Sequence, residues 1–291
     1  MTGSLGKNAL GRTAEERFGI KADPDDVEKL QTYIRDTYNR VDPEIIDKVF
    51  LSGEAAGFLT VNETYFFREP AHFSFLRELL PSFEKTGIQI CSAAVASGCE
   101  AYSIAMLIEA YSRSAEKPLP YHIDAFDINP RVIETACQGI YSTRTLREDG
   151  SSFHYLADPF LRKLENENPE GNPGVQPRRR LPEGSSAFGP GIRYQVEPSL
   201  KKNIHFFVHN LMEELPAREY DLVFFRNAFI YFSPRYRERI LSNLIAVLKK
   251  GGFLIMGVSE TAGVRHAGID GKNRNDVFYF QKSAPAKPHV Q

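Results

Sequence analysis

A glutamate stands at the end of a loop of small residues, where a bound ligand could meet its carboxylate. The segment SAAVASGCE, residues 92–100, holds one glycine, Gly98, and lacks the Gly-Lys-Ser/Thr ending of a phosphate-binding loop. Glu100 would also repel phosphate at the start of the helix expected after this loop. A carboxylate there suits a ligand with an ammonium group, such as the methionine end of S-adenosylmethionine. The alternative, that Glu100 only complements the helix dipole, fits the loop equally well.

A second acidic position comes at the end of the next apolar run, in the segment DAFDIN, residues 124–129. In parallel sheets an acidic residue after the second strand commonly accepts hydrogen bonds from ribose hydroxyls. Asp127 suits this role better than Asp124, which falls in the middle of the expected strand. The competing interpretation makes Asp127 a turn or N-cap residue ahead of Pro130.

Two later strand ends also carry polar residues. Asn210-Leu211 follows one apolar run, and Arg226-Asn227 follows another. Polar loop residues on a rigid scaffold are often functional. Each pair alone indicates little, but parallel strands bring their carboxyl ends to one edge of a sheet.

The period of the apolar residues predicts the elements that position these groups. From residue 88 onward, strand-like runs alternate with helical patterns, which is typical of a parallel sheet covered by helices on both faces. The expected strands are 88–93, 121–128, 204–208, 220–225 and 253–258, the expected helices lie at about 100–113, after Asn129-Pro130 and at 235–250, and 276–281 is expected to be a final edge strand.

The chain divides into four expected parts. Residues 1–20 are predicted to be a loose arm or a single loose helix. Residues 21–83 are helical in pattern, with the last helix opened by Pro70. The α/β domain covers residues 84–282, with an insert at about 150–205 that contains the basic run Arg178 to Arg180, and residues 283–291 are a tail. Such basic runs are usually solvated, so we favour a solvated segment here, with contact to an acidic partner as the alternative.

Composition excludes several classes of function. A net charge of -1 gives no general attraction to nucleic acid or to anionic membranes. There is no signal-peptide pattern and no run of about 20 apolar residues for membrane insertion, so we expect a cytoplasmic protein. The seven histidines and three cysteines lack the spacings of a metal site or a disulfide framework. His205 and His209 are therefore expected to be structural, and Cys99 to be a small buried side chain and not a redox-sensitive thiol.

Six segments, taken in order, resemble the CheR family of chemotaxis receptor methyltransferases. The similarity runs from about Asn62 to Gln281. Its segments are NETYFFREP at 62–70, the loop and helix start at 92–103, DINP at 127–130, Asn210-Leu211, the stretch 226–232, and KKGGFLIMGVSE at 249–260. The resemblance implies a doubly wound, Rossmann-like domain of the S-adenosylmethionine-dependent methyltransferase type, preceded by a small N-terminal helical domain. It also implies an inserted β subdomain, which docks on receptors in some family members.

The resemblance implies an activity and a set of site residues. The activity is methyl transfer from S-adenosylmethionine, leaving S-adenosylhomocysteine, to glutamate side chains on the cytoplasmic domain of chemoreceptors in chemotaxis-type signalling. Glu100 would meet the methionyl amine, Asp127 the ribose and Asn210-Leu211 the adenine. The expected cofactor-binding residues are Asn62, Thr64, Arg68, Gly98, Glu100, Asp127, Asn210, Leu211, Arg226 and Asn227.

The expected chemistry needs alignment more than acid–base catalysis. A glutamate acceptor is already ionised at neutral pH, since its ordinary pKa is about 4.3, so proximity and exclusion of water are the main requirements. We predict that Arg68 and Tyr231 are the catalytic residues and position the incoming carboxylate. Phe66 and Phe67 are candidates for the wall of the site, with ordinary core residues as the alternative.

One motif departs from the family's pattern. The family usually has Gly-Glu-Glu-Pro-Tyr-Ser in the cofactor loop, and this chain has GCEAYS at residues 98–103. The changes at Cys99 and Ala101 support the alternative of a non-catalytic, cofactor-binding or scaffolding relative. A methyltransferase for another protein or a small molecule is a further alternative, because fold does not fix substrate. The sequence leaves the receptor and the oligomeric state open.

Overall fold

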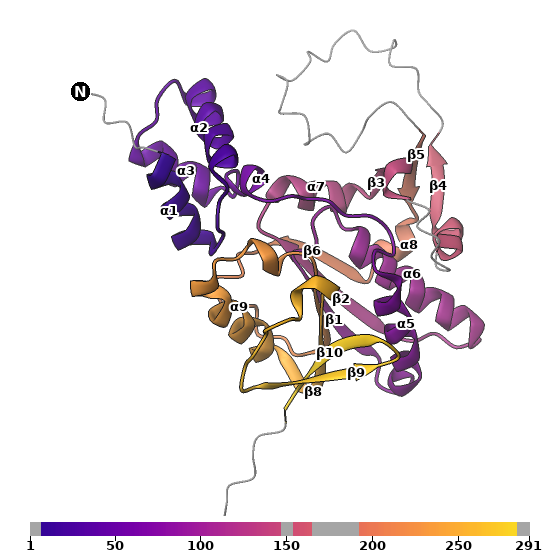
Figure 1. The fold of residues 1–291 in the computed structure, drawn as a ribbon. Coiled ribbons are helices and arrows are strands. Elements are labelled where there is room, and N and C mark those ends of the chain that lie inside the picture. Colours follow the sequence, from indigo (N-terminus) through magenta and orange to yellow (C-terminus); the bar gives the residue numbers. More distant parts are fainter. Residues whose placement is uncertain (1–6, 147–153, 165–191, 284–291) are drawn as a thin grey trace, which may run out of the picture.

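The computed structural model describes residues 7–146, 154–164 and 192–283 and is built around one seven-stranded sheet (Figure 1). The strand order is β6-β2-β1-β7-β8-β10-β9. Neighbouring strands from β6 to β8 pair in parallel, whereas β10 is antiparallel to both β8 and β9. The strands are β1 Ile88–Ala93, β2 Tyr121–Asp127, β6 Ile204–Val208, β7 Tyr220–Phe225, β8 Leu248–Met256, β9 Ile269–Arg274 and β10 Val277–Lys282. This confirms the predicted mostly parallel, doubly wound α/β sheet.

The order of the strands creates a switch point between β1 and β7. The chain leaves β1 toward β2 and β6 on one side, then returns to the other side of β1 as β7. Loops at the carboxyl ends of β1 and β7 therefore diverge, and ligands bind in such crevices in open α/β sheets.

Alternate residues of the central strands enter two separate cores. In β1, Ile88 and Ile90 belong to one buried cluster, and Cys91 and Ala93 belong to the other. Helices α5, Pro70–Leu79, and α6, Cys99–Ser114, cover the first face, and α9, Pro234–Ala246, covers the second. Because both faces are buried, these strands are continuous apolar runs in the sequence.

Helix starts follow from local sequence signals. Prolines occupy the first turn of α5, of α9 and of α7, which spans Pro130–Gln138. The N-cap of α7 is Asn129, whose side chain accepts a hydrogen bond of 3.0 Å from the Arg131 amide. Three short 3-10 helices are η1 Leu80–Phe83, η5 Phe229–Tyr231 and η6 Val258–Glu260.

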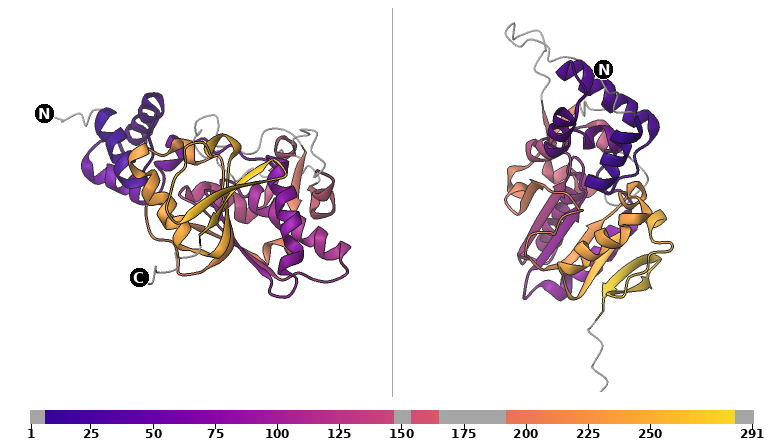
Figure 2. Two further views of the ribbon diagram at one scale, coloured as in Figure 1. Left: turned by 60° about the horizontal axis from the view of Figure 1, so that its bottom comes forward. Right: turned by 90° about the vertical axis from the view of Figure 1, so that its left-hand side faces the viewer.

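The N-terminal helices share a core with the sheet. They are α1 Lys7–Phe18, α2 Pro24–Tyr38, α3 Pro43–Leu51 and α4 Ala56–Leu59, at one end of the sheet (Figure 2). Of the two predictions for residues 1–20, a loose arm or a single loose helix, the helix is present as α1, but it is not loose, because Leu10, Ala14 and Phe18 are buried in the cluster that α9 covers. The helix opened by Pro70, predicted as part of the N-terminal region, packs instead against α6 and β10.

A three-stranded antiparallel sheet forms the inserted part. It consists of β3 Ile140–Ser142, β5 Arg193–Val196 and β4 Leu161–Leu164, in that order. The turns η2 Thr143–Thr145, η3 His154–Leu156 and η4 Asp158–Phe160 and the helix α8 Pro198–Lys201 accompany it. The insert thus begins at β3, ahead of the predicted residue 150, and residues 204–205 already belong to β6 of the main sheet. The basic run 178–180 lies outside the described residues.

The predicted final edge strand is wrong in its position. β10 matches residues 276–281 closely, but it lies between β8 and β9, and β9 is the edge. β9 was missed because its residues after Ile269 are exposed and polar or glycine. Its signal is the turn at Asn275 and Asp276, whose φ angles of 50° and 62° suit a tight hairpin. Among the described helices, none has the length and apolar character that crossing a bilayer requires.

Candidate active site

A cavity opens where β1, β2, β6 and β7 end. Its volume is about 920 Å³ when the open mouth is included. All the predicted site residues except Gly98 line it. They are Asn62, Thr64, Arg68, Glu100, Asp127, Asn210, Leu211, Arg226, Asn227 and Tyr231. The sheet therefore brings together residues that are up to 169 positions apart in the sequence.

Gly98 shapes the loop without lining the cavity. Its φ of 90° is in the left-handed region, and it precedes α6 as the N-cap residue. A Cβ at this position would come within 2.7 Å of the Ala136 Cβ and 3.2 Å of the Tyr141 hydroxyl. Glycine is needed here so that the loop can turn against α7.

Glu100 faces the cavity and is held by two neighbours. The Ser92 hydroxyl donates to Oε1 at 2.7 Å, and Nη1 of Arg226 donates to Oε2 at 2.9 Å. The Arg226 side chain is 1% exposed and Glu100 is 13% exposed. The pairing lowers the cost of keeping this carboxylate charged in a largely buried place.

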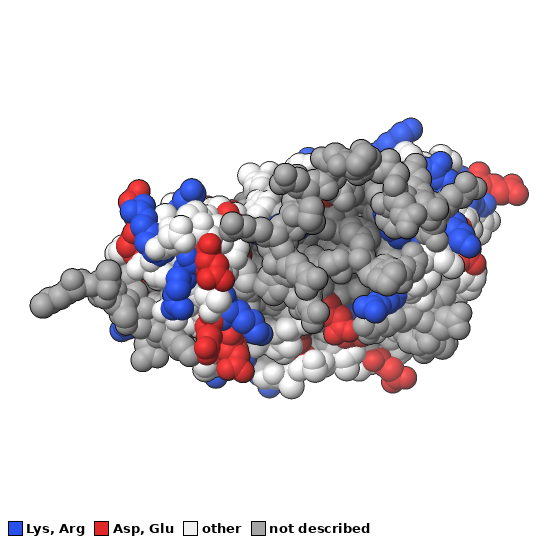
Figure 3. All heavy atoms as spheres, turned by 90° about the horizontal axis from the view of Figure 1, so that it is seen from above, with Lys and Arg blue, Asp and Glu red and all other residues white. Residues whose placement is uncertain are grey.

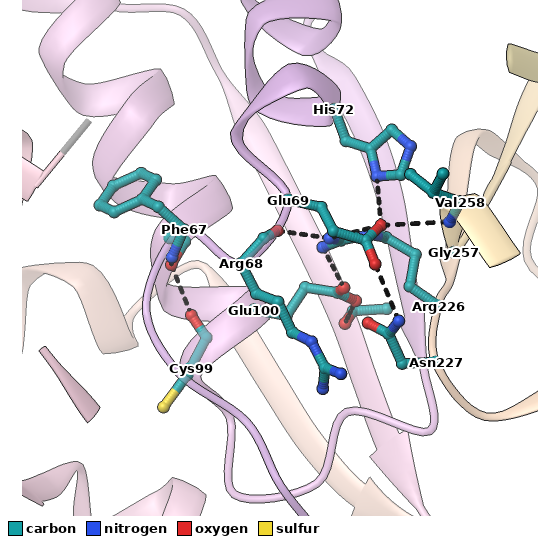
Figure 4. Close-up of polar contacts among 12 residues, drawn as sticks. Phe67, Arg68, Glu69, His72, Cys99, Glu100, Arg226, Asn227, Gly257 and Val258 are labelled. Atoms are coloured by element: carbon teal, nitrogen blue, oxygen red, sulfur yellow. Dashed lines mark hydrogen bonds and ion pairs between the residues drawn. The ribbon is translucent and has the colours of Figure 1, made fainter. Parts of the chain in front are cut away.

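Arg226 also joins this carboxylate to the segment ahead of α5. Its Nη2 contacts Oε2 of Glu69 at 3.3 Å and donates to the carbonyl of Arg68. Glu69 in turn accepts a hydrogen bond of 2.8 Å from Nδ2 of Asn227 (Figure 4). The Nε of Arg226 is buried and has no hydrogen-bond partner among the described residues.

A third glutamate, Glu260, holds the loops after β7 and β8 together. It accepts hydrogen bonds from the backbone amides of Asn227 at 2.6 Å, Gly257 at 3.0 Å and Ile230 at 3.2 Å. Burial raises the pKa of Glu260, and these amides act in the opposite direction. The hydrogen bonds to Glu260 therefore fix the backbone of the loop that carries Arg226, Asn227 and Tyr231.

Asp127 fixes the turn after β2 and also lines the cavity. Its Oδ2 accepts from the Ala96 amide at 3.0 Å, and its Oδ1 accepts from the Asn129 amide at 3.0 Å, which fixes the turn after β2. The same carboxylate lines the cavity, and each oxygen keeps lone-pair capacity for a ligand hydroxyl. Burial raises the pKa of Asp127, while the two amides lower it. The N-cap of the following helix is Asn129 and not Asp127.

Asn210 ties the end of β6 to the N-terminal helices. Its Nδ2 donates to the carbonyl of Arg17 at 2.8 Å, and its Oδ1 accepts from the Met212 amide at 3.0 Å. Leu211 is 5% exposed and presents an apolar wall. His209, predicted to be structural, also lines the cavity, and burial lowers its pKa.

The predicted catalytic residues lie in the same cavity. Nη1 of Arg68 donates to the carbonyl of Glu63 at 2.8 Å, and its guanidinium lies 5.7 Å from the centre of the Tyr65 ring. Burial raises the pKa of Tyr231, and the charge of Arg68 lowers it. The Tyr231 hydroxyl therefore stays protonated at neutral pH and can donate a hydrogen bond.

The aromatic wall differs from the predicted one. Phe66 and Phe67 are 0% exposed and belong to a buried cluster, so the alternative that they are ordinary core residues holds for both and neither lines the cavity. Phe73 lines the cavity instead, and the Arg226 guanidinium lies 5.7 Å from its ring centre. Phe66 packs against the Tyr141 ring and Phe67 against the Phe73 ring, with ring centres 5.0 Å and 5.2 Å apart.

Cys99 is a buried core residue, as predicted. It is 0% exposed, and burial raises the pKa of its thiol to about 12. The thiol is therefore neutral at physiological pH and inaccessible to oxidants. No group of three or more potential metal ligands occurs among the described residues.

Besides Phe73 and His209, sequence reasoning missed other residues of the site or its support. Glu69 and Glu260 lie inside segments that resemble the family, but no role was assigned to them. Phe18 and Ile20 line the cavity from the end of α1, which was expected to be loose. The signal for α1 was available: Leu10, Ala14 and Phe18 recur at intervals of four, ahead of a glycine with a φ of 71°.

The cavity's chemistry matches S-adenosylmethionine. Glu100 offers a carboxylate for an ammonium group, and Asp127 offers acceptors for a ribose diol. Phe126 and Leu211 supply apolar walls for a base. A doubly wound sheet with an acidic residue after its second strand binds nucleotide-containing cofactors at its switch point, and the groups in this cavity suit the cofactor of the S-adenosylmethionine-dependent methyltransferases.

Comparison with known proteins identifies the family. The model of the CheR methyltransferase, SAM binding domain, matches residues 62–162 and 187–269. The chain is 31% identical over 228 residues to a chemotaxis protein methyltransferase of Borreliella burgdorferi, covering 75% of this chain and 67% of that protein. It is 33% identical over 208 residues to chemotaxis protein methyltransferase 1 of Vibrio cholerae, covering 70% and 66%. A chemotaxis protein methyltransferase of Listeria monocytogenes is 27% identical over 239 residues, covering 81% and 78%.

The chain belongs to the CheR methyltransferase family, and its cofactor is S-adenosylmethionine. The aligned part spans about two thirds of the length of the relatives from Borreliella and Vibrio. The resemblance inferred from the six motifs is therefore confirmed.

Proposed function

We propose that this chain transfers the methyl group of S-adenosylmethionine to glutamate side-chain carboxylates on the cytoplasmic domain of a chemoreceptor. It would act in the cytoplasm, in chemotaxis-type adaptation. The observation that carries the proposal is that one cavity holds Arg68 and Tyr231 together with Glu100 and Asp127. Cofactor groups and a cationic acceptor site thus share one space at the switch point of the sheet.

The residues of this chain would divide the work between cofactor and acceptor. When bound, S-adenosylmethionine supplies an electrophilic methyl group on a sulfonium. Glu100 would bind its ammonium group, Asp127 its ribose and Asn210-Leu211 its adenine, with Asn62 and Thr64 along the approach. Arg68 would pair with the incoming carboxylate, and the Tyr231 hydroxyl would donate to its second oxygen. The acceptor is already ionised, so orientation and exclusion of water supply the catalysis.

On the face seen from above, lysine, arginine, aspartate and glutamate side chains of the described residues are mixed around the N-terminal helices (Figure 3). The acceptor carboxylate would pair with Arg68, whose side chain lines the cavity together with Tyr231.

The direct test is methyl transfer from labelled S-adenosylmethionine to a purified receptor cytoplasmic fragment. Glutamate esters release labelled methanol in base, whereas N-methyl groups do not. Arg68→Ala should abolish most turnover while leaving stability close to wild type, and Arg144→Ala, an exposed arginine outside the cavity, serves as the control. Transfer to another acceptor in a panel, or cofactor binding without any transfer, would overturn the proposal in favour of a different substrate or a scaffolding role.

A further inference from the structure

Two non-glycine residues with left-handed backbone, Glu69 and Asn227, are joined by a hydrogen bond, and a third, Phe67, lies two residues before Glu69. Phe67, Glu69 and Asn227 have φ angles of 55°, 57° and 57°. The Phe67 amide donates to the Ser103 hydroxyl at 2.9 Å, and the Asn227 side chain donates to Glu69. Such conformations persist only where the surroundings hold them, and they concentrate at functional sites.

Glu69 is the centre of a hydrogen-bonded cluster. Besides Arg226 and Asn227, its carboxylate accepts from the Val258 amide at 3.3 Å and lies 3.2 Å from Nδ1 of His72, so four residues from three segments of the chain converge on it (Figure 4). Burial raises the pKa of Glu69, but the contact with His72, the charge of Arg226 and the Asn227 amide outweigh it and hold that pKa well below its ordinary value. The carboxylate is therefore ionised throughout the physiological range.

The cluster fixes the backbone on both sides of Arg68. Its carbonyl accepts from Arg226, and the next residue, Glu69, is anchored by its side chain. In Figure 4 the Arg68 guanidinium extends away from the Glu69 carboxylate, and Arg68 lines the cavity. Two consecutive residues thus point to different places, one into the supporting cluster and one into the site.

Arg226 is also shared between two carboxylates. It lies 2.9 Å from Glu100 and 3.3 Å from Glu69. Without the charge of Glu69, the whole attraction of Arg226 would fall on Glu100. A carboxylate that is more strongly paired inside the protein is less available to the ammonium group of a ligand.

We propose that Glu69 is a positioning residue for methyl transfer, which directs Arg68 toward the acceptor and keeps Glu100 available to the cofactor. The acceptor half of this inference rests on the proposed function, and the cofactor half does not. Glu69 itself touches neither substrate; it acts through Arg68, Arg226 and Asn227.

The test is Glu69→Gln, which keeps the shape and one acceptor oxygen but removes the charge. We expect kcat with a receptor fragment to fall about tenfold or more, and the Kd for S-adenosylhomocysteine, measured by calorimetry without acceptor, to rise several-fold. One hydrogen bond to a charged group corresponds to about tenfold to about a hundredfold. Glu69→Asp keeps the charge on a shorter side chain and should restore part of the affinity for the cofactor product.

Asp221→Asn is the matched control. Asp221 is another partly buried carboxylate, which accepts from the Gln89 amide at 2.8 Å and pairs with Lys249 at 2.8 Å near the amino end of β7. It should lower the melting temperature without changing kcat or Kd. If Glu69→Gln behaves like this control, with kcat and Kd unchanged in folded protein, Glu69 is merely structural and the inference is overturned. If the wild type binds S-adenosylhomocysteine but methylates no receptor fragment, the proposed function fails, while the calorimetric comparison still decides the role of Glu69.

Discussion

Replacing Arg226 with Met should be among the most destabilising single changes in the site. The substitution keeps most of the side-chain length but removes a guanidinium that is 1% exposed. It deletes the ion pairs with Glu100 and Glu69 and the hydrogen bond to the Arg68 carbonyl. Two carboxylates, 13% and 22% exposed, are left without their cation.

The magnitude follows from that uncompensated charge. Removing one partner of a buried ion pair costs about 3–5 kcal/mol. Because Glu69 keeps Asn227 and Val258 as donors and both carboxylates retain some contact with water, we expect the lower end, about 3 kcal/mol. Arg226→Lys should recover only part of this, since one ammonium cannot reproduce the planar fork that reaches two carboxylates and a carbonyl.

Urea unfolding at neutral pH measures the effect as a change in the midpoint at constant slope. The triple variant Arg226→Met, Glu69→Gln, Glu100→Gln supplies the internal comparison, because it removes the two stranded charges together with the cation. It should be more stable than Arg226→Met alone. A loss below about 1 kcal/mol for Arg226→Met, or no recovery in the triple variant, would refute the assignment of Arg226 as a shared buried counter-ion.

Three further outcomes test other parts of the site. Asp127→Ala should raise the Kd for S-adenosylhomocysteine at least about tenfold, measured by calorimetry, and unchanged binding would exclude Asp127 from the cofactor site. Iodoacetamide should label the exposed Cys137 in the native protein and leave the buried Cys91 and Cys99 unmodified, as peptide mapping by mass spectrometry would reveal; rapid native labelling of Cys99 would contradict its raised pKa. Because the pKa of Glu69 is lower in the folded than in the unfolded chain, its stabilisation is fully present above about pH 4.5 and is lost as pH falls through the folded-state pKa. Urea midpoints should therefore decline below that pH in the wild type and decline less steeply in Glu69→Gln.

The central strands could be predicted because a strand that is buried on both faces is a short, continuous run of apolar residues in the sequence. Ile88 to Ala93 and Tyr220 to Phe225 are short apolar runs, and the structure places strands at those residues. β9 gave no such signal, since only Ile269 in it is buried. An antiparallel edge strand is specified by its hairpin turn and its partner, not by its own hydrophobicity.

The site was predictable at strand ends and less so elsewhere. Asp127 and Arg226 follow apolar runs, and parallel topology alone brings such positions to one edge. Phe18 and Ile20 reach the same cavity through tertiary packing, aided by the hydrogen bond from Asn210 to the Arg17 carbonyl, a contact 193 residues apart in the sequence. Local patterns carry no information about which distant loop such a helix end will meet.

The departures at Cys99 and Ala101 fall at buried positions in the first turn of α6, on either side of Glu100. Both residues are 0% exposed, while Glu100 between them lines the cavity. Successive helical residues point about 100° apart, so these three side chains cannot all face the ligand. The carboxylate that the family usually has at the position of Cys99 would here lie in a site that raises the pKa of a thiol to about 12, a site unfavourable to any anion. The loss of that carboxylate therefore removes no group from the cavity and gives no support to a non-catalytic role.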